Sequence, residues 1–289
     1  MEPLHLKAYA KINLTLEVLG RRPDGYHNIT TLLQTIALWD DLLLFPAEDG
    51  ISVECSEPAL QGPSNLVYRA VALLQEAAGI CRGVRIVVRK AIPVAGGLGG
   101  GSADAGAVLR GLVRLWGLSL PMERLVALGE RLGADVPFFL WGGTALAEGR
   151  GEKITPLPPL PETWFVLLAP PLGSEGKTAR LFRLLEPRHF TDGSRTRALA
   201  DSLRQGFPLS DALLFNAFEA VAWDAFPGLE AYWRGLEECA CAPPHLSGAG
   251  PSLFALASSP HKAQECAQRL RARGWRAWAV PSVGPEGGE

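Results

Sequence analysis

The sequence has little that would suit it to nucleic acid or to a membrane. Its formal net charge is −2, so it offers no bulk attraction to a polyanion or to an anionic lipid surface. No run of about 18 apolar residues occurs, and charged residues interrupt the N-terminal segment, so we expect neither a spanning helix nor a signal peptide. We therefore expect no nucleic-acid and no membrane partner.

Cysteine is also scarce. The chain has 5 cysteines, an odd number, and they are scattered. None forms a C-x-x-C pair, and no neighbouring cluster has the spacing of a metal site. We expect them to be reduced, as in a cytoplasmic chain. They are Cys55, Cys81, Cys239, Cys241 and Cys266.

What the chain does contain is enough apolar material for two globular domains. It has 289 residues, of which 47% are hydrophobic and 20% charged. The segment from Thr155 to Glu162, Thr-Pro-Leu-Pro-Pro-Leu-Pro-Glu, has the composition of a linker. We predict one domain over 1–155 and another over 163–283, in an α+β class because strands and helices alternate after the linker. The sequence leaves open whether the protein is a monomer or a homodimer.

Several local patterns give expectations that the structure can test. Apolar alternation predicts a strand up to Leu19 and another over 30–45, the latter interrupted by a turn at Asp40-Asp41, although two acids could also form a metal pair. The segment 138–147 looks like two strands joined at glycines, and the polar segment 186–206 like a surface excursion. We expect the tail from Gly284 to be frayed.

The stretch from Pro93 to Asp104 is the most informative. Glycine occupies 5 of the 6 positions 96–101, after a strand pattern over 84–89 and before a helical pattern that follows Ser102, which stands where an N-cap would be. Glycines let a ligand approach the main chain, and a helix N-terminus offers unpaired N–H groups to an anion. No common phosphate-loop template fits, since the lysine of G-x-x-x-x-G-K-[ST] is absent. We interpret the stretch as a phosphate cradle rather than a flexible turn, because ordering so many glycines is costly.

Three other places carry residues suited to chemistry. Lys11 and Asn13 have the same parity in a predicted strand and would point to one face, although Lys11 could simply be solvated. Tyr26 and His27 follow a turn and could stack on and hydrogen-bond a planar base, or be ordinary surface. Asp135, in Gly-Ala-Asp-Val-Pro, could be no more than a turn residue.

Together, segments 8–16, 96–104 and 246–251 resemble the GHMP kinase superfamily. More narrowly, 10–16 with 22–27, the glycine loop and 133–137 are similar to its branch that phosphorylates the 2-hydroxyl of a cytidine diphosphate derivative of methylerythritol, on the non-mevalonate route to isopentenyl diphosphate. The resemblance implies an N-terminal domain like domain 2 of ribosomal protein S5, a ferredoxin-like C-terminal domain, and an active site in the cleft between them. It also implies ATP and Mg²⁺.

The resemblance assigns roles residue by residue. Asp135 would be the catalytic base, and Lys11 would offset developing charge or hold Asp135 ionised. Asn65 and Lys90 would contact the adenine end, and Ser102 would lie near the β-phosphate and Mg²⁺. The residues that would enclose the ATP phosphates are Pro93, Val94, Ala95, Gly96, Gly97, Leu98, Gly99, Gly100, Gly101, Ser102 and Ala103.

For the acceptor, Tyr26 and His27 would form the cytosine site, Phe182 would be a second stacking ring, and Asn13 would face the polar part of the substrate. Asp104 would complement the helix N-terminus rather than bind metal.

Three positions depart from the family pattern. Lys177-Thr178 and Phe182 stand where Ser-Thr and a later Tyr are common, and Ala249 replaces a serine in the last glycine turn.

Alternatives remain. Another GHMP kinase, acting on mevalonate, homoserine or a sugar, would have no use for Tyr26-His27. A non-catalytic nucleotide sensor would not need both Lys11 and Asp135. An RNA-binding protein of the S5-like fold would need a basic surface.

Overall fold

The fold is built on one long antiparallel hairpin. The computed structural model describes residues 2–173, 176–240 and 242–285. In it β1 (Leu4–Arg21) pairs with β2 (His27–Ala47) from Leu4↔Leu44 to Arg21↔His27. Most of β1 is buried rather than alternately exposed, because other elements cover both of its faces.

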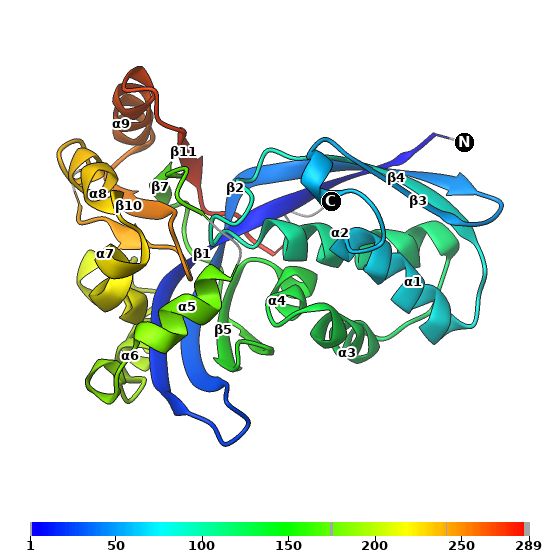
Figure 1. The fold of residues 1–289 in the computed structure, drawn as a ribbon, viewed down its shortest axis with the longest axis horizontal. Helices are drawn as coiled ribbons and strands as arrows, with labels where there is room; N and C mark the ends of the chain where they lie inside the picture. Colours follow the sequence, from blue (N-terminus) through cyan, green and yellow to red (C-terminus); the bar gives the residue numbers. More distant parts are fainter. Residues whose placement is uncertain (1, 174–175, 241, 286–289) are drawn as a thin grey trace.

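This hairpin is the centre of a seven-stranded sheet of order β3-β4-β2-β1-β8, in which β5 also pairs with β2, and β6 with β5. Helices α1 to α4 cover one face of it (Figure 1). Their buried apolar residues pack with those of the strands into one cluster. The other strands of this sheet are β3 (Ile51–Cys55), β4 (Gly83–Arg89), β5 (Thr144–Gly149), β6 (Lys153–Pro156) and β8 (Phe215–Asn216), and the helices are α1 (Leu66–Ala78), α2 (Gly100–Trp116), α3 (Met122–Leu132) and α4 (Val136–Trp141).

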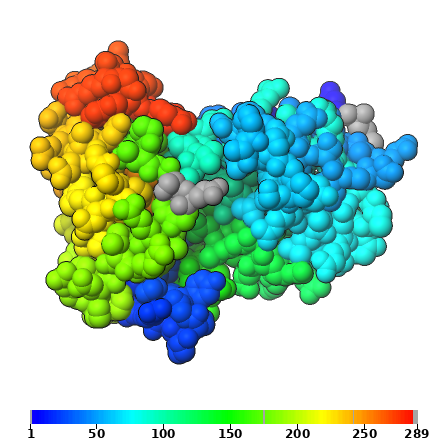
Figure 2. Space-filling view, viewed as in Figure 1, coloured from blue at the N-terminus to red at the C-terminus, as the bar shows by residue number. Residues whose placement is uncertain are grey.

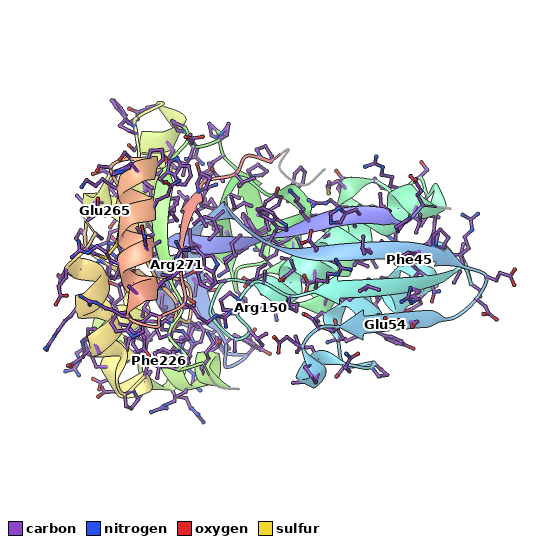
Figure 3. All side chains as sticks on the ribbon, turned by 90° about the horizontal axis from the view of Figure 1, so that it is seen from above. Phe45, Glu54, Arg150, Phe226, Glu265 and Arg271 are labelled. Atoms are coloured by element: carbon purple, nitrogen blue, oxygen red, sulfur yellow. A yellow bond between two sulfur atoms is a disulfide. The ribbon has the colours of Figure 1, made fainter. Side chains whose placement is uncertain are left out.

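A second sheet of four strands, in the order β11-β7-β10-β9, forms the other end of the molecule. Helix α9 packs on it and carries Glu265 and Arg271 (Figure 3). Its strands are β7 (Trp164–Leu168), β9 (His245–Leu246), β10 (Leu253–Ala257) and β11 (Ala277–Pro281), and the helices of this half are α5 (Lys177–Leu184), α6 (Ser194–Arg204), α7 (Ala222–Ala225), α8 (Leu229–Glu237) and α9 (Pro260–Ala272). The 3-10 turns of the chain are Pro58–Leu60, Pro187–His189, Asp211–Leu213 and Ala217–Val221.

The two halves share structure across the cleft. Strand β8 pairs in parallel with β1 of the first sheet, through Thr15↔Phe215 and Leu16↔Asn216. Leu16 and Val18 in turn pack into the apolar cluster of the second half. The α+β class is confirmed, whereas the boundaries at 155 and 163 stay a prediction.

Three local expectations were wrong. Strand β2 runs unbroken through Asp40, which is fully buried and paired with Lys90 instead of lying in a turn. The first part of segment 138–147 belongs to helix α4. This helix is enclosed by other elements and is apolar on nearly every side, so its sequence shows no helical period. The polar segment 186–206 contains α6, held by buried Leu199 and Leu203.

The cysteines differ from expectation as well. Cys239, just after α8, and Cys266, on α9, form a disulfide, because these two helices pack side by side. Cys55 and Cys81 are free thiols, and Cys241 lies outside the described residues. Most of the tail expected to be frayed, 286–289, also lies outside them. No helix in the described part of the chain is long and apolar enough to cross a membrane.

Candidate active site

The glycine loop connects β4 to α2, as predicted, but its helix begins earlier than expected. Gly99 is the N-cap, with φ of +73°, and Ser102 is the third helical residue rather than the cap. A side chain at position 99 would adopt this left-handed conformation only with strain, and its Cβ would lie 2.6 Å from the Phe139 ring. The N–H groups of the first helical turn have no partner within the helix, so they remain available to an anion.

A second glycine loop, residues 246–252, supports the first. The Ser252 amide donates to the Gly96 carbonyl at 3.1 Å, and the Ser247 hydroxyl donates to the Gly97 carbonyl at 3.0 Å. The chain at Gly97 has φ of +84°, and a Cβ there would lie 2.2 Å from the Ser247 carbonyl oxygen. The two loops therefore approach too closely for any side chain at 97. Our sequence reasoning did not identify Ser247 or Ser252 as supports, since nothing local marks a contact across 150 residues.

Replacing Gly97 by alanine is expected to weaken ATP binding at least about tenfold, which corresponds to about 1.4 kcal/mol. The added methyl group forces the two loops apart and displaces the amides that face the phosphates. Gly62→Ala is the matched control: Gly62 also has a positive φ, of +86°, but no atom lies within 4 Å of its Cβ position. Titration of each variant with ATP by calorimetry checks this, and equal ATP affinities for the two variants would contradict it.

Lys11 and Asp135 meet beside the glycine loop between β4 and α2. The Lys11 ammonium lies 3.9 Å from a carboxylate oxygen of Asp135, and the Lys11 amide donates to the carbonyl of Leu98 at 3.0 Å. Lys11 is buried, whereas the Asp135 side chain is 43% exposed and therefore accessible to a substrate. Burial lowers the pKa of Lys11, and the negative charge of Asp135 opposes that effect.

Asn13 orients this pair, because it shares a face of β1 with Lys11 as the parity predicts. Lys11 donates to its side-chain oxygen at 2.6 Å, and its amide nitrogen donates to the Thr31 hydroxyl at 2.8 Å. The Lys11 ammonium thus has a fixed position between an amide oxygen and the carboxylate of Asp135.

The two residues predicted for the adenine end have side chains engaged within the protein. Asn65 caps α1, accepting from the Val67 amide at 2.8 Å and donating to the Leu60 carbonyl at 2.7 Å. Lys90 is buried and pairs with Asp40 at 2.5 Å and with Asp104 at 2.6 Å. Both stay predictions for nucleotide contact.

Asp104 does not serve the helix N-terminus as expected. It lies inside α2 and belongs to the buried Lys90 cluster. Burial raises the pKa of its carboxyl, and Lys90 opposes this rise.

A cavity of about 980 Å³ lies between residues of the two halves, and its lining reaches Ala134, the residue before Asp135. Figure 2 shows a depression between these halves. His27 and Phe182 line the cavity with stacked rings, 4.7 Å between centroids and 14° between planes. Tyr26 is 58% exposed at the rim, and the Arg150 guanidinium lies 5.3 Å from its ring.

The cavity also has a charge pattern that we did not predict. Burial lowers the pKa of His27, and the charge of Arg21 adds to this effect, so that the imidazole is neutral and can both donate and accept. The lining arginines are Arg21, Arg131, Arg150 and Arg183. Glu130 also lines the cavity, and Arg131 and Arg150 have carboxylate partners, Glu76 at 3.6 Å and Glu152 at 3.9 Å. The lining still has more cations than anions, which suits an anionic ligand.

A dedicated metal cage is absent from this geometry. In 2–173, 176–240 and 242–285, no group of three or more His, Cys, Asp or Glu residues could hold a metal ion. Mg²⁺ sites in proteins commonly have only one or two protein ligands, the others being phosphate oxygens and water. Ser102, in the first turn of α2, offers a hydroxyl, and Asp135 offers an accessible carboxylate.

Known proteins resemble the chain along its whole length. The family model for the GHMP kinases N terminal domain matches residues 65–143, and that for the GHMP kinases C terminal domain matches 198–275. Proteins named 4-diphosphocytidyl-2-C-methyl-D-erythritol kinase, from Dehalococcoides mccartyi and Moorella thermoacetica, are 45% and 44% identical. The first match covers 98% of this chain and 99% of the relative, and the second 94% and 96%.

Solved structures agree. A crystal structure of 4-(cytidine 5'-diphospho)-2C-methyl-D-erythritol kinase has a TM-score of 0.85 at 38% identity, covering 97% of this chain and 100% of that one. A homoserine kinase from Cytophaga hutchinsonii has a TM-score of 0.75 at 19% identity, covering 98% and 95%, which shows a shared fold alone.

Proposed function

On the premise that this chain belongs to the GHMP kinase family and, within it, to the 4-diphosphocytidyl-2-C-methyl-D-erythritol kinases, we propose that it transfers the γ-phosphoryl group of ATP to the 2-hydroxyl of 4-diphosphocytidyl-2-C-methyl-D-erythritol. Its family makes it a kinase that uses ATP as the phosphate donor and an alcohol as the acceptor. The observation that carries the assignment of the catalytic residues is the Lys11–Asp135 pair, held between the phosphate loop and the aromatic cavity.

In the proposed reaction the carboxylate of Asp135 accepts the proton of the 2-hydroxyl. The hydroxyl oxygen forms its bond to the γ-phosphorus as the bond to the bridging oxygen breaks and ADP leaves. A carboxylate is a weak base for an alcohol, but it need take the proton only as the new bond forms. Lys11 offsets the charge that gathers on the transferred group, from a position fixed by Asn13.

The phosphate loop supplies positioning, which is most of what phosphoryl transfer requires of a protein. The first-turn amides of α2 and the loop from Pro93 to Ala103 enclose the ATP phosphates in this proposal. Mg²⁺, held by phosphate oxygens with the Ser102 hydroxyl, would neutralise charge on the donor. Asn65 and Lys90 lie toward the adenine end.

The acceptor occupies the cavity. Tyr26, His27 and Phe182 bind the cytosine, and the lining arginines balance the charge of the diphosphate. Because His27 and Phe182 stack directly on one another in the structure, one of the two rings must shift if the base is to lie between them. Asn13 faces the methylerythritol part.

Replacing His27 by alanine is expected to raise KM for the cytidyl substrate about fivefold and leave KM for ATP unchanged, since one stacked ring contributes about 1 kcal/mol. Steady-state kinetics with each substrate varied in turn measure both constants. His261→Ala, on the exposed face of α9, is the control. A rise of the same size in both KM values would remove His27 from the base pocket.

The substrate is tested by ADP release from Mg-ATP with the cytidyl compound, run beside mevalonate, homoserine and galactose. Turnover with the cytidyl compound alone supports the proposal. Turnover with one of the others instead would retain the phosphate loop and Asp135 but discard the cytosine site. ATP binding without turnover of any acceptor would support the non-catalytic sensor.

A further inference from the structure

A second lysine lies beside the catalytic pair. Lys177 is the first residue of α5, it is 9% exposed, and its ammonium donates to the carbonyl oxygens of Ala249, at 3.2 Å, and of Gly250. These two oxygens belong to the second glycine loop, which also bonds the phosphate loop. The next residue, Thr178, lines the acceptor cavity. Lys177 is thus placed where the nucleotide and the acceptor sites meet.

The partners of Lys177 are neutral. Within the described residues no carboxylate forms an ion pair with its ammonium. The pKa of Lys177 is lowered to about 7, chiefly by burial and further by the nearby charge of Lys11, while the charge of Asp135 opposes both. Two buried ammonium groups therefore face one half-exposed carboxylate.

The elements packed against α5 do not supply the missing negative charge. Glu219, in the 3-10 turn that follows β8, accepts from the Leu246 amide at 2.9 Å and contacts His245 at 3.3 Å. Asp224 on α7 is exposed, and α5 itself adds the cations Arg180 and Arg183. A buried charge without a counter-ion is unfavourable, and a bound anion would remove that cost.

The second glycine loop connects Lys177 to the reaction centre. Gly248 lies so close to Lys11 that a Cβ there would be 3.0 Å from the ammonium and 2.9 Å from the Asn13 side-chain oxygen. The loop thus contacts Lys11 at Gly248 and Lys177 at the two carbonyls that follow.

We propose that Lys177 is a second catalytic cation, whose ammonium binds the phosphoryl group as it passes from ATP to the acceptor; this rests on the proposed function. Lys11 and Lys177 then flank the transferred group, and Asp135 takes the acceptor proton between them. No bond to Lys177 forms or breaks. Serine is common at this position in the family that the chain resembles, whereas this chain has a lysine.

Lys177 should take up a proton when a γ-phosphate binds beside it, and this uptake can be measured without any acceptor. At pH 8 a lysine of pKa about 7 is roughly nine-tenths neutral, and a γ-phosphate beside it favours the charged form. Binding of the imido analogue of ATP at pH 8 should therefore take up close to one proton more than the same experiment with Lys177→Met. Calorimetry in buffers of different ionisation enthalpy measures this number. ADP, which lacks the γ-phosphate, should show no such difference between the two proteins.

The control is Lys153→Met, which removes an exposed lysine of β6 and should match the wild type with both nucleotides. Equal proton uptake by the wild type and Lys177→Met would overturn the proposal. An equal difference with ADP would place Lys177 on another phosphate and would overturn its role at the transferred group. ADP affinity also reports whether Lys177→Met is folded.

Kinetics provide a second test. Lys177→Met should lower kcat about 100-fold with KM for ATP changed less than about threefold, as expected for a group that binds mainly the transition state. Lys177→Arg keeps the charge, so it should recover at least part of the lost kcat and keep it above pH 8. If Lys177→Arg is as inactive as Lys177→Met while both remain folded, a catalytic charge is excluded. If the wild type does not phosphorylate the cytidyl compound, the proposed function fails, whereas the proton measurement still tests Lys177.

Discussion

Replacing Asp135 by asparagine is expected to lower kcat about 1,000-fold or more and to leave the affinity for ATP within about threefold of the wild type. Asparagine keeps the shape of the side chain but cannot accept the hydroxyl proton. The substitution should leave the fold, and with it the ATP affinity, intact. Asp135 is the N-cap residue of α4, but its side chain makes no cap hydrogen bond there. Single-turnover kinetics with the cytidyl substrate and calorimetry with ATP measure the two quantities.

Asp201→Asn serves as the control, since this exposed residue of α6 pairs only with Arg204, in the next turn of the same helix. A kcat like that of the wild type in Asp135→Asn would exclude Asp135 as the base. A fall in ATP affinity as large as the fall in kcat would instead assign Asp135 to nucleotide binding.

The largest effect on stability is expected at Lys90. Lys90→Met leaves the carboxylates of Asp40 and Asp104 buried together without a counter-ion. Removing one partner of a buried ionic cluster costs about 3–5 kcal/mol. In a chain of this size that lowers Tm by roughly 10 °C, which thermal denaturation followed by circular dichroism measures.

The comparison variant is Arg85→Met on β4. Arg85 pairs with Glu54 on the neighbouring strand β3 at 2.7 Å, but both side chains are about half exposed, 46% and 53%. Figure 3 labels Glu54. Exposed pairs of this kind contribute under about 1 kcal/mol. Adding Asp104→Asn to Lys90→Met should restore part of the lost stability, because one uncompensated charge is removed. No recovery in the double variant would mean that the loss arises from packing and not from charge.

Features that depend on neighbouring residues could be predicted from the sequence. The parity of Lys11 and Asn13 placed both on one face of β1, and the structure joins them at 2.6 Å. The glycine-rich stretch between a strand and a helix was interpreted as a phosphate cradle, and the chain is a member of a kinase family.

The predictions were wrong where a segment distant in the sequence determines the local structure. Asp40 has the character of a turn residue, but Lys90 neutralises it inside a continuous strand. The apolar run 138–141 looks like a strand, yet it folds as a helix because α2 and α3 enclose it. Nothing in the sequence relates Cys239 to Cys266, and it is the packing of α8 against α9 that brings them together.

The sequence by itself thus determined the family and the reaction and predicted the residues of a phosphate loop, because short-range geometry and motif spacing are properties of consecutive residues. Only the tertiary structure decided which charges meet. It buried Lys90 between two acids, set the second glycine loop against Gly97, and brought Lys177 near Lys11 and Asp135. The strength of a charge interaction depends on distance and burial, and neither quantity can be obtained from the order of the residues alone.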